Sequence, residues 1–574
     1  LHLSLRRQRQ MCIRDRLKAP ALDAFKAVLE PTAEGREIST TQAFVRILNQ
    51  VLRDKELGPR VVPILADESR TFGMEGLFRQ IGIYAPEGQK YTPVDKDQVM
   101  YYKEAADGQL LQEGINEAGA MSSWIAAATS YSSNNRIMIP FFIYYSMFGF
   151  QRIGDLAWAA GDMQARGFLL GGTAGRTTLN GEGLQHEDGH SHILASTIPN
   201  CVSYDPTFGH ELAVIIQHGL KRMVEDQENV YYYLTVMNEN YPQPGLTQGD
   251  EEGIIKGMYK LKSHGKGKNR VQLMGSGTIL REVMAAQELL EADWGVASDL
   301  WSVTSFTELR RNGLDAERHN MLHPDEKKPQ VAYVTEQLAK TEGPIIASTD
   351  YMKLFADQIR PFVPKGREYK VLGTDGFGRS DFRAKLREHF EVDRHFVVVA
   401  ALRALQLGRE LDALGLAARQ LGGRLPQAQV AQADRREQAQ RPLDGCVVHE
   451  EGMRLVHRHR EHVGDALAAQ PHLPRRRVEA RAAACRARRV DAGHEQQLDA
   501  DEALALAGRA AALGDVEREL AGIEAARLRG AGLREQLAHM VEQPGVGREV
   551  GTRRAADRLL VDPHQPPDPI QALD

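Results

Sequence analysis

Apolar runs of strand length alternate with longer segments of helical spacing along residues 17–403. Strands are expected at 60–67, 136–148, 168–173, 201–206 and 230–236, and helices at 106–130, 153–167 and 208–226. Strands that are apolar throughout and separated by helices are typical of a parallel sheet covered on both faces. We therefore expect a three-layer, doubly wound α/β domain over 17–262, with ligands at the carboxyl ends of its strands.

The same alternation restarts after a polar segment. The sequence SHGKGKNR at 263–270 is rich in Gly and Lys and predicts a linker. Beyond it, the pattern predicts strands at 295–303, 343–350 and 369–374, and helices at 281–294 and 381–390. This arrangement indicates a second, smaller α/β domain over 271–403.

The composition excludes several classes of protein. The 574 residues are 42% hydrophobic and 26% charged with a formal net charge of −5. These values argue against a disordered chain, a collagen-like fibre and a strongly basic nucleic-acid binder. Four cysteines are too few for a disulfide scaffold and fit a reducing compartment. No run approaches the about 18 apolar residues of a membrane span, so we expect a cytoplasmic protein with no membrane or nucleic-acid partner.

The two ends of the chain differ in composition from the part between them. Residues 1–16 begin without Met and are dominated by Arg, and we interpret them as a non-native or disordered leader rather than an export signal. Residues 404–574 contain 25 Arg but no Lys, Ser, Asn, Phe, Tyr or Trp. Ordinary domains use all of these types, so we interpret this tail as a wrong-frame translation, with an Ala/Leu/Arg-rich helical extension as the alternative. No role is assigned to Cys446 or Cys485.

The segment LQHEDGHSH at 184–192 is a first candidate for chemistry. An H-E-x-x-H pattern begins at His186, but such a pattern binds zinc on a helix, where residues four apart face one ion. The preceding residues 171–183 are too rich in Gly for a good helix, and Gly189 lies inside the pattern. We expect no metal there. A surface loop and an active-site loop that presents imidazoles to an anionic substrate remain open.

Glu117 is a second candidate, in the sequence GINEAG at 114–119. Its predicted helix is otherwise built largely of small and apolar residues, and a carboxylate on such a face is costly unless it is paired or protonated. Two interpretations remain open. Glu117 is either salt-bridged or exposed, or it is held in an apolar pocket to share a proton with a heterocyclic nitrogen.

An aromatic run, PFFIYYSMFGF at 140–150, is a third candidate. It continues a predicted buried strand, and core packing accounts for it. The alternative is a surface on which a planar ligand ring stacks.

Four long stretches together resemble one family. They are similar to the homodimeric pyruvate dehydrogenase first components of bacteria, which are thiamine-diphosphate enzymes of the transketolase-like group. The resemblance covers about 20–403 and ends where the composition changes. It is carried by LADESRTFGMEGLFRQIGIY (65–84), KEAADGQLLQEGINEAGAMSSWIAAATSYS (103–132), the segment from PFFIYYSMFGF to HEDGHSH (140–192) and VLGTDGFGRSDFRAKLREHFEVD (371–393).

The resemblance implies how the chain is organised. The family's first domain binds diphosphate and Mg²⁺ through a GDG…NN signature, which this sequence does not contain, so we expect a fragment without that domain. Residues 17–262 resemble the pyrimidine-binding domain, and 271–403 resemble the transketolase-like C-terminal domain. In the family the cofactor lies between two subunits. The resemblance therefore implies a homodimer in which this chain supplies half of each site.

The resemblance also implies residue roles. Glu117 aligns with the Glu that activates the cofactor by donating a proton to its pyrimidine ring nitrogen. His186 resembles a substrate-facing His. The implied catalytic residues are Glu117, His186, Glu68 and Glu182, and the implied cofactor contacts are Glu117, Ile115, Tyr145, Phe148 and Asp67.

The function implied is the thiamine-diphosphate-dependent oxidative decarboxylation of pyruvate. The acetyl unit would pass to the lipoyl domain of dihydrolipoyl acetyltransferase, within the pyruvate dehydrogenase complex. Three alternatives remain: another transketolase-like enzyme acting on sugar phosphates, an inactive fragment that serves in assembly, and a zinc protease built on the pattern at His186.

Overall fold

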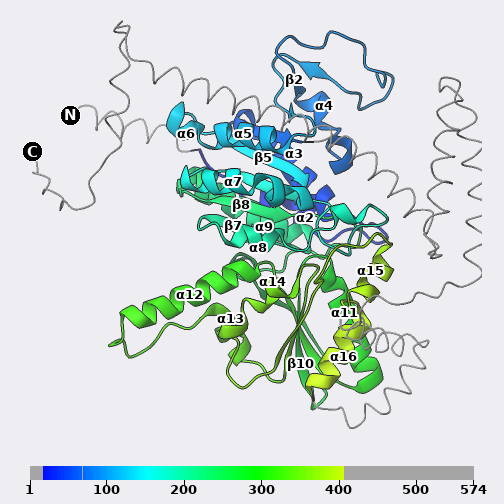
Figure 1. Cartoon of the computed structure of the whole chain (residues 1–574), viewed down its shortest axis with the longest axis vertical. Helices are drawn as coiled ribbons and strands as arrows, with labels where there is room; N and C mark the ends of the chain where they lie inside the picture. The colour runs from blue at the N-terminus through cyan, green and yellow to red at the C-terminus, as the bar shows by residue number, and fades with distance from the viewer. Residues whose placement is uncertain (1–16, 67–68, 406–574) are drawn as a thin grey trace, which may run out of the picture. The chain divides into compact units, whose positions relative to one another are not determined.

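The computed structural model describes residues 17–66 and 69–405, which are coloured in Figure 1. The leader at 1–16, the predicted site residues Asp67 and Glu68, and almost all of the predicted tail lie outside the described residues. In the described part of the chain, no helix combines the length and apolar character needed to cross a membrane.

The first sheet has six parallel strands in the order β4-β1-β5-β6-β8-β7. Strands β1, β6, β7 and β8 are buried along their whole length, as expected for a parallel sheet between two layers of helices. This confirms the predicted doubly wound α/β architecture. The strands are β1 (Val61–Leu65), β4 (Leu111–Gln112), β5 (Ile139–Tyr145), β6 (Phe168–Gly172), β7 (Cys201–Tyr204) and β8 (Tyr231–Thr235).

Two hydrophobic cores fill the two faces of this sheet. On one face the core includes α3 (Thr40–Arg53) and α9 (Gly209–Leu220). On the other face it includes α5 (Glu117–Ala128) and α7 (Gly149–Asp162). The shorter elements around them are α2 (Lys26–Leu29), α4 (Leu77–Gln80), α6 (Ser130–Ser133), α8 (Ser191–Ser196), α10 (Glu251–Lys256) and the paired strands β2 (Ile83–Tyr84) and β3 (Glu104–Ala105).

Helix α5 begins later than the sequence pattern predicts. The expected helix over 106–130 starts only at Glu117, because β4 precedes it and Gly114 adopts a positive φ of 78° that does not fit a right-handed helix. The side chain of Asn116 caps the helix by accepting a hydrogen bond from the Gly119 N–H at 3.0 Å. Glu117 thus lies in the first turn, where the partial positive charge of the helix end favours a carboxylate.

The second sheet is mixed, with the strand order β13-β12-β10-β11-β9 and only β9 antiparallel. One of its cores includes α11 and α16, and the other includes α12, α13 and α14. The strands are β9 (Tyr259–His264), β10 (Arg270–Gly275), β11 (Ala297–Ser302), β12 (Ile345–Ser348) and β13 (Tyr369–Leu372). The helices are α11 (Ile279–Trp294), α12 (Phe306–Leu322), α13 (Tyr333–Ala339), α14 (Lys353–Asp357), α15 (Arg383–His389) and α16 (Arg394–Ala404).

The prediction of a linker between the two domains at 263–270 is wrong. The segment contains the end of β9 and the first residue of β10, so both of its ends belong to the second sheet. The residues of the edge strand β9 after Tyr259 are exposed or half-buried, and its last two, Ser263 and His264, fall in the polar segment that resembles a linker. The chain therefore passes from the first sheet to the second before Tyr259.

A buried polar junction joins the two sheets. The Asp350 carboxylate, just after β12, accepts hydrogen bonds from the Thr177 N–H at 2.8 Å and from the hydroxyls of Thr177 and Thr178 at 2.7 and 2.6 Å. Arg176 donates from its guanidinium to the carbonyls of Gly376, at 2.6 Å, and Thr374. The loop after β6 thus binds the carboxyl end of the second sheet.

Trp124 ties α5 to the first sheet, and this contact can be tested. Its side chain is fully buried, and its Nε1–H donates to the Phe168 carbonyl at 3.0 Å. Trp124→Phe removes this hydrogen bond and part of the buried indole, and we expect it to lower the free energy of unfolding by about 1–3 kcal/mol in urea denaturation. Trp158→Phe is the matched control, because Trp158 is 53% exposed on α7 and should change stability by less than about 0.5 kcal/mol. Equal effects of the two variants would contradict this role.

Candidate active site

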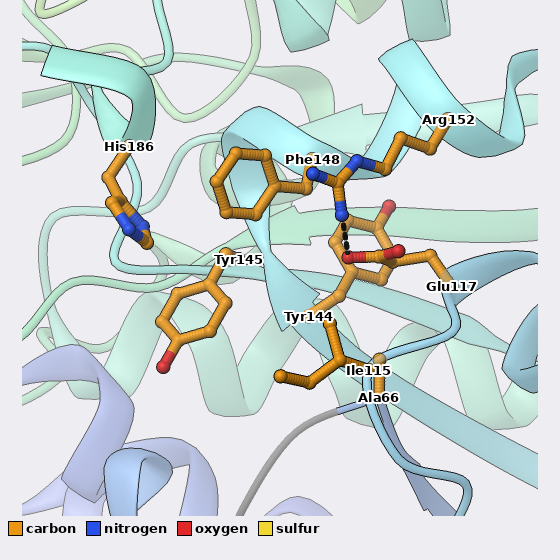
Figure 2. A pocket seen from close by; sticks show the side chains of 8 residues that line it. All are labelled: Ala66, Ile115, Glu117, Tyr144, Tyr145, Phe148, Arg152 and His186. Atoms are coloured by element: carbon orange, nitrogen blue, oxygen red, sulfur yellow. Dashed lines mark hydrogen bonds and ion pairs between the residues drawn. The ribbon is translucent and has the colours of Figure 1, made fainter. Parts of the chain in front are cut away.

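A pocket lies at the carboxyl end of the first sheet. Its lining residues come from the last two residues of β5 and from the segments that follow the adjacent strands β4, β1, β5 and β6. Strand β1 lies between β4 and β5 in the sheet. The chain continues from β1 to β4 on one side of β1, and β5 then pairs with the other side of β1. The pocket is therefore at a topological switch point, where open parallel sheets bind ligands. The lining residues, shown in Figure 2, are Ala66, Ile115, Glu117, Tyr144, Tyr145, Phe148, Arg152 and His186.

Glu117 is the carboxylate of this pocket. It is only 8% exposed, and its Oε1 accepts a hydrogen bond from Nη1 of Arg152 at 2.6 Å, the dashed contact in Figure 2. The two interpretations of Glu117 therefore both describe part of its surroundings, since the side chain is sheltered in the pocket and also paired with a cation. A paired carboxylate avoids the cost of burying an isolated charge.

Arg152 is a pocket residue that the sequence analysis missed. Its guanidinium lies over the Phe148 ring, 4.3 Å from the centroid, and its side chain is 47% exposed. A signal was present in the sequence, since Arg152 follows Phe148 by four residues and so lies on the same side of a helical turn. Arg152 therefore pairs with Glu117 while remaining partly in solvent.

Three rings form one wall of the pocket. The His186 ring packs edge-on against Phe148, with centroids 4.9 Å apart, and against Tyr145 at 5.2 Å. Tyr145 and Phe148 are themselves 6.1 Å apart at 75°. Tyr144 also lines the pocket, and within the described residues its buried hydroxyl has no hydrogen-bond partner. Burial raises the pKa of Tyr144 well above its usual value, so its phenol stays protonated inside the first domain.

The H-E-x-x-H pattern does not form a metal-binding helix. His186 ends the short 3₁₀ helix η5 (Leu184–His186), whereas His190 immediately precedes α8. The Nε2 of His190 lies 3.0 Å from Nε2 of Gln151, while His186 faces the aromatic wall. The two imidazoles thus point to different surroundings, which removes the geometric basis of the zinc-protease alternative.

The loop that carries His186 is held by buried groups. Asp188 accepts hydrogen bonds from the N–H groups of His190 and Ser191, both at 3.0 Å. Gly189 packs against the guanidinium of Arg176, and a Cβ at this position would lie 2.3 Å from its Cζ. A larger residue there would have to displace this guanidinium, which is bonded to the carbonyls of Thr374 and Gly376.

The remaining predicted residues occupy different places. Ile115 lines the pocket but is 78% exposed, which places it at the rim. Glu182 is exposed and does not line the pocket; its backbone carbonyl accepts a hydrogen bond from the Ser380 hydroxyl at 3.1 Å. Asp67 and Glu68 follow the pocket residue Ala66 directly but lie outside the described residues.

The fold and the pocket define an α/β protein with a ligand site at the switch point of a parallel sheet, followed by a second, mixed-sheet domain. Residues 17–244 match the family model for the pyruvate dehydrogenase E1 component middle domain. Residues 257–393 match the model for the transketolase-like TK C-terminal domain. These matches to the E1 middle domain and to a transketolase-like C-terminal domain confirm the resemblance found in the sequence.

Curated proteins that are similar to this chain are named pyruvate dehydrogenase E1 component. The pyruvate dehydrogenase E1 component of Pseudomonas aeruginosa is 65% identical over 404 residues, which cover 70% of this chain and 45% of the relative. That of Escherichia coli is 63% identical over 405 residues, again 70% and 45% of the two chains. The chain thus spans somewhat less than half the length of these relatives. Among solved structures, a transketolase from Campylobacter jejuni is 18% identical with a TM-score of 0.48, over 67% of this chain and 49% of that one.

Glu187, next to His186, makes the stability of this loop depend on pH. It is buried, its Oε2 accepts a hydrogen bond from the Arg379 N–H at 2.6 Å, and burial raises its pKa from 4.5 to about 7. Between these values the folded chain keeps a proton that the unfolded chain releases. The protonated carboxyl therefore favours folding below pH 4.5, and this contribution is lost as the pH rises through 7.

Glu187→Gln replaces the titrating group with a neutral one and isolates this effect. We expect the Tm of the unmodified chain, relative to that of the variant, to fall by about 2 °C or more between pH 5 and pH 8. Calorimetry across this range provides the measurement. Glu182→Gln, on the exposed part of the same loop, controls for the loss of a charge. If the difference in Tm between the unmodified chain and Glu187→Gln did not vary with pH, Glu187 would not be the titrating group.

Proposed function

We propose that this chain forms the pyrimidine-binding half of a thiamine-diphosphate site that decarboxylates pyruvate. The observation that carries the proposal is the Glu117 carboxylate, sheltered beside three aromatic rings in a region 63–65% identical to E1 components. The acetyl unit then passes to the lipoyl group of dihydrolipoyl acetyltransferase, in the cytoplasm. The E1 relatives are named as components of pyruvate dehydrogenase. The transfer of the acetyl unit to a lipoyl partner is part of our proposal.

The pocket fits an aminopyrimidine ring. Tyr145 and Phe148 supply flat apolar surface for a planar ring, and Glu117 supplies one carboxylate for a ring nitrogen. When bound, thiamine diphosphate provides a carbanion-like carbon and an electron sink for the release of carbon dioxide.

The side chains of this chain then have separate tasks. Glu117 holds a proton at the ring nitrogen, and Arg152 donates to its Oε1 beside that position. His186, supported by the aromatic wall, faces the substrate and donates to a carboxylate or a developing oxyanion. We propose Ile115 as a contact at the rim, and Glu182, Glu68 and Asp67 as more distant polar groups of the same cavity.

The diphosphate and its Mg²⁺ need groups that this pocket does not offer. The described lining contains a single carboxylate, whereas Mg²⁺ is held by several oxygen ligands in octahedral geometry. We infer that a further polypeptide segment supplies them and that the complete site lies between the subunits of a homodimer. The chain alone then provides the pyrimidine half of each site.

A chimaera tests this function directly. Residues 17–393 would replace the matching segment of the Pseudomonas aeruginosa relative, and carbon dioxide release from pyruvate would be measured with thiamine diphosphate and Mg²⁺. We expect the chimaera to turn over within about tenfold of its parent, and Glu117→Gln within it to lower turnover by about 10² or more, because it removes acid–base catalysis. Turnover of a sugar phosphate in place of pyruvate would favour the transketolase-type alternative.

Two outcomes would overturn the proposal. A Glu117→Gln chimaera with unchanged turnover would remove Glu117 from the chemistry. A chimaera that folds and dimerises like its parent but releases no carbon dioxide would mean that this chain serves in assembly alone. Glu113→Gln is the matched control, since Glu113 lies exposed before the same helix and outside the pocket lining, and it should keep turnover unchanged.

A further inference from the structure

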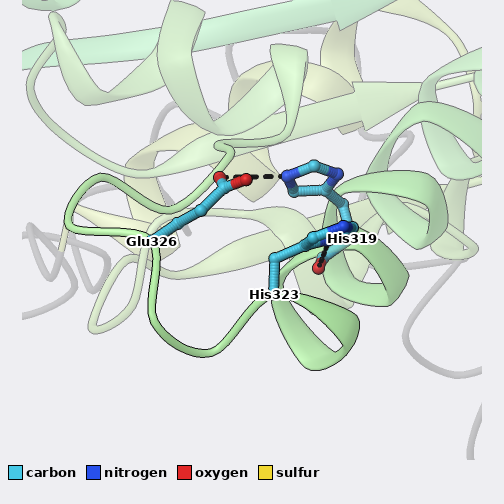
Figure 3. A group of neighbouring side chains, drawn as sticks. All are labelled: His319, His323 and Glu326. Carbon is cyan, nitrogen blue, oxygen red and sulfur yellow. Dashed lines mark hydrogen bonds and ion pairs between the residues drawn. The ribbon is translucent and has the colours of Figure 1, made fainter.

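Three side chains at the end of α12 form a cluster that has no part in the pocket. His319 lies in the last turn of the helix, His323 is its C-cap, and Glu326 lies in the turn that follows, as Figure 3 shows. They belong to the second domain, whereas every lining residue of the pocket belongs to the first. We call these three residues the α12 cluster.

The ligand atoms of the α12 cluster lie close together. One nitrogen of each imidazole and one Glu326 oxygen all fall within 4.8 Å of one another. The Nε2 of His319 is 3.1 Å from Oε2 of Glu326, and the two rings stack with centroids 4.2 Å apart. Two ligands bound tetrahedrally at about 2.0–2.1 Å from one zinc ion are separated by about 3.3 Å, so the His319–Glu326 pair already has this spacing.

A backbone hydrogen bond prepares His323 as a ligand. Its Nδ1 lies 2.9 Å from the carbonyl oxygen of His319. A carbonyl can only accept, so Nδ1 carries the proton and Nε2 keeps its lone pair. Metal-binding histidines in proteins are usually held in this way, with the second ring nitrogen donating to a carbonyl or a carboxylate.

The turn that carries Glu326 is itself held against the helix. The Glu326 N–H donates to the His323 carbonyl at 3.2 Å. Further along, Asn320 accepts from the Gln330 N–H at 2.7 Å and donates to the Gln330 carbonyl at 2.9 Å. These bonds hold both sides of the turn, so the carboxylate stays near the two imidazoles.

We propose that His319, His323 and Glu326 bind a divalent transition-metal ion, with Zn²⁺ as the best match. Two imidazoles and one carboxylate form a donor set that zinc accepts in four-coordinate geometry, with a fourth position left open. All three residues are at least partly exposed, so water can occupy that position. A single carboxylate with two nitrogens discriminates against Mg²⁺ and Ca²⁺, which require mostly oxygen ligands.

The test compares metal binding by the full chain and by His319→Gln/His323→Gln. Zn²⁺ would be titrated in competition with a chromophoric chelator, and Co²⁺ would report the ligand set through its visible absorption. We expect the double variant to bind one ion fewer per chain and to lose one cobalt absorption component. Both proteins contain the histidines elsewhere in the chain, so metal bound by those residues does not contribute to the difference between the two titrations. Glu326→Gln should weaken zinc binding at this site by about tenfold or more.

His264→Gln is the matched control, because His264 pairs with Glu291 on the surface but has no second imidazole beside it in the described structure. This variant should bind the same number of zinc ions as the unmodified chain. The proposal fails if the double variant binds as many zinc ions as the unmodified chain, with the same affinity. It also fails if millimolar Mg²⁺ displaces the zinc ion bound at the α12 cluster of the unmodified chain.

Discussion

The arrangement of the two sheets depends on how one buried carboxylate is satisfied. Asp350 is fully buried, and its oxygens accept three hydrogen bonds from Thr177 and Thr178. An isolated charge in that position would be very costly, so the loop after β6 must lie where its amide and hydroxyl groups reach Asp350. That loop also carries Arg176, which packs against Gly189 three residues from His186. The position of His186 thus follows from hydrogen bonds made at the other sheet.

Much of the fold could be predicted because its strands are apolar throughout. β1, β5, β6, β7 and β8 all fall within predicted runs, since a sheet buried on both faces requires such residues. The sequence does not predict the edge strand β9, whose first four residues fall in the predicted first domain and whose last two fall in the predicted linker, because an edge strand half in solvent has no such pattern. Helix α5 was predicted too long, because the small residues before it suit a helix, whereas the conformation of Gly114 does not.

The candidate site was predicted less completely than the fold. The structure brings Ile115, Glu117, Tyr145, Phe148 and His186 together, and these residues were found through a resemblance rather than through spacing alone. The spacing of Arg152 from Phe148 indicates that the two side chains are neighbours, but it does not indicate the pair with Glu117, which is 35 positions away on a different helix. Glu182 lies near the same loop in sequence but points to solvent, since proximity along a loop does not fix the direction of a side chain.

The close approach at Gly175 has a practical consequence for dividing this molecule. A Cβ there would lie 2.1 Å from a carboxylate oxygen of Asp350, so the two sheets meet without room for a single extra methyl group. Separate expression of either half would leave this seam open to water, with Asp350 on one product and its threonine donors on the other. Truncation boundaries and fusion points are therefore better placed outside both halves.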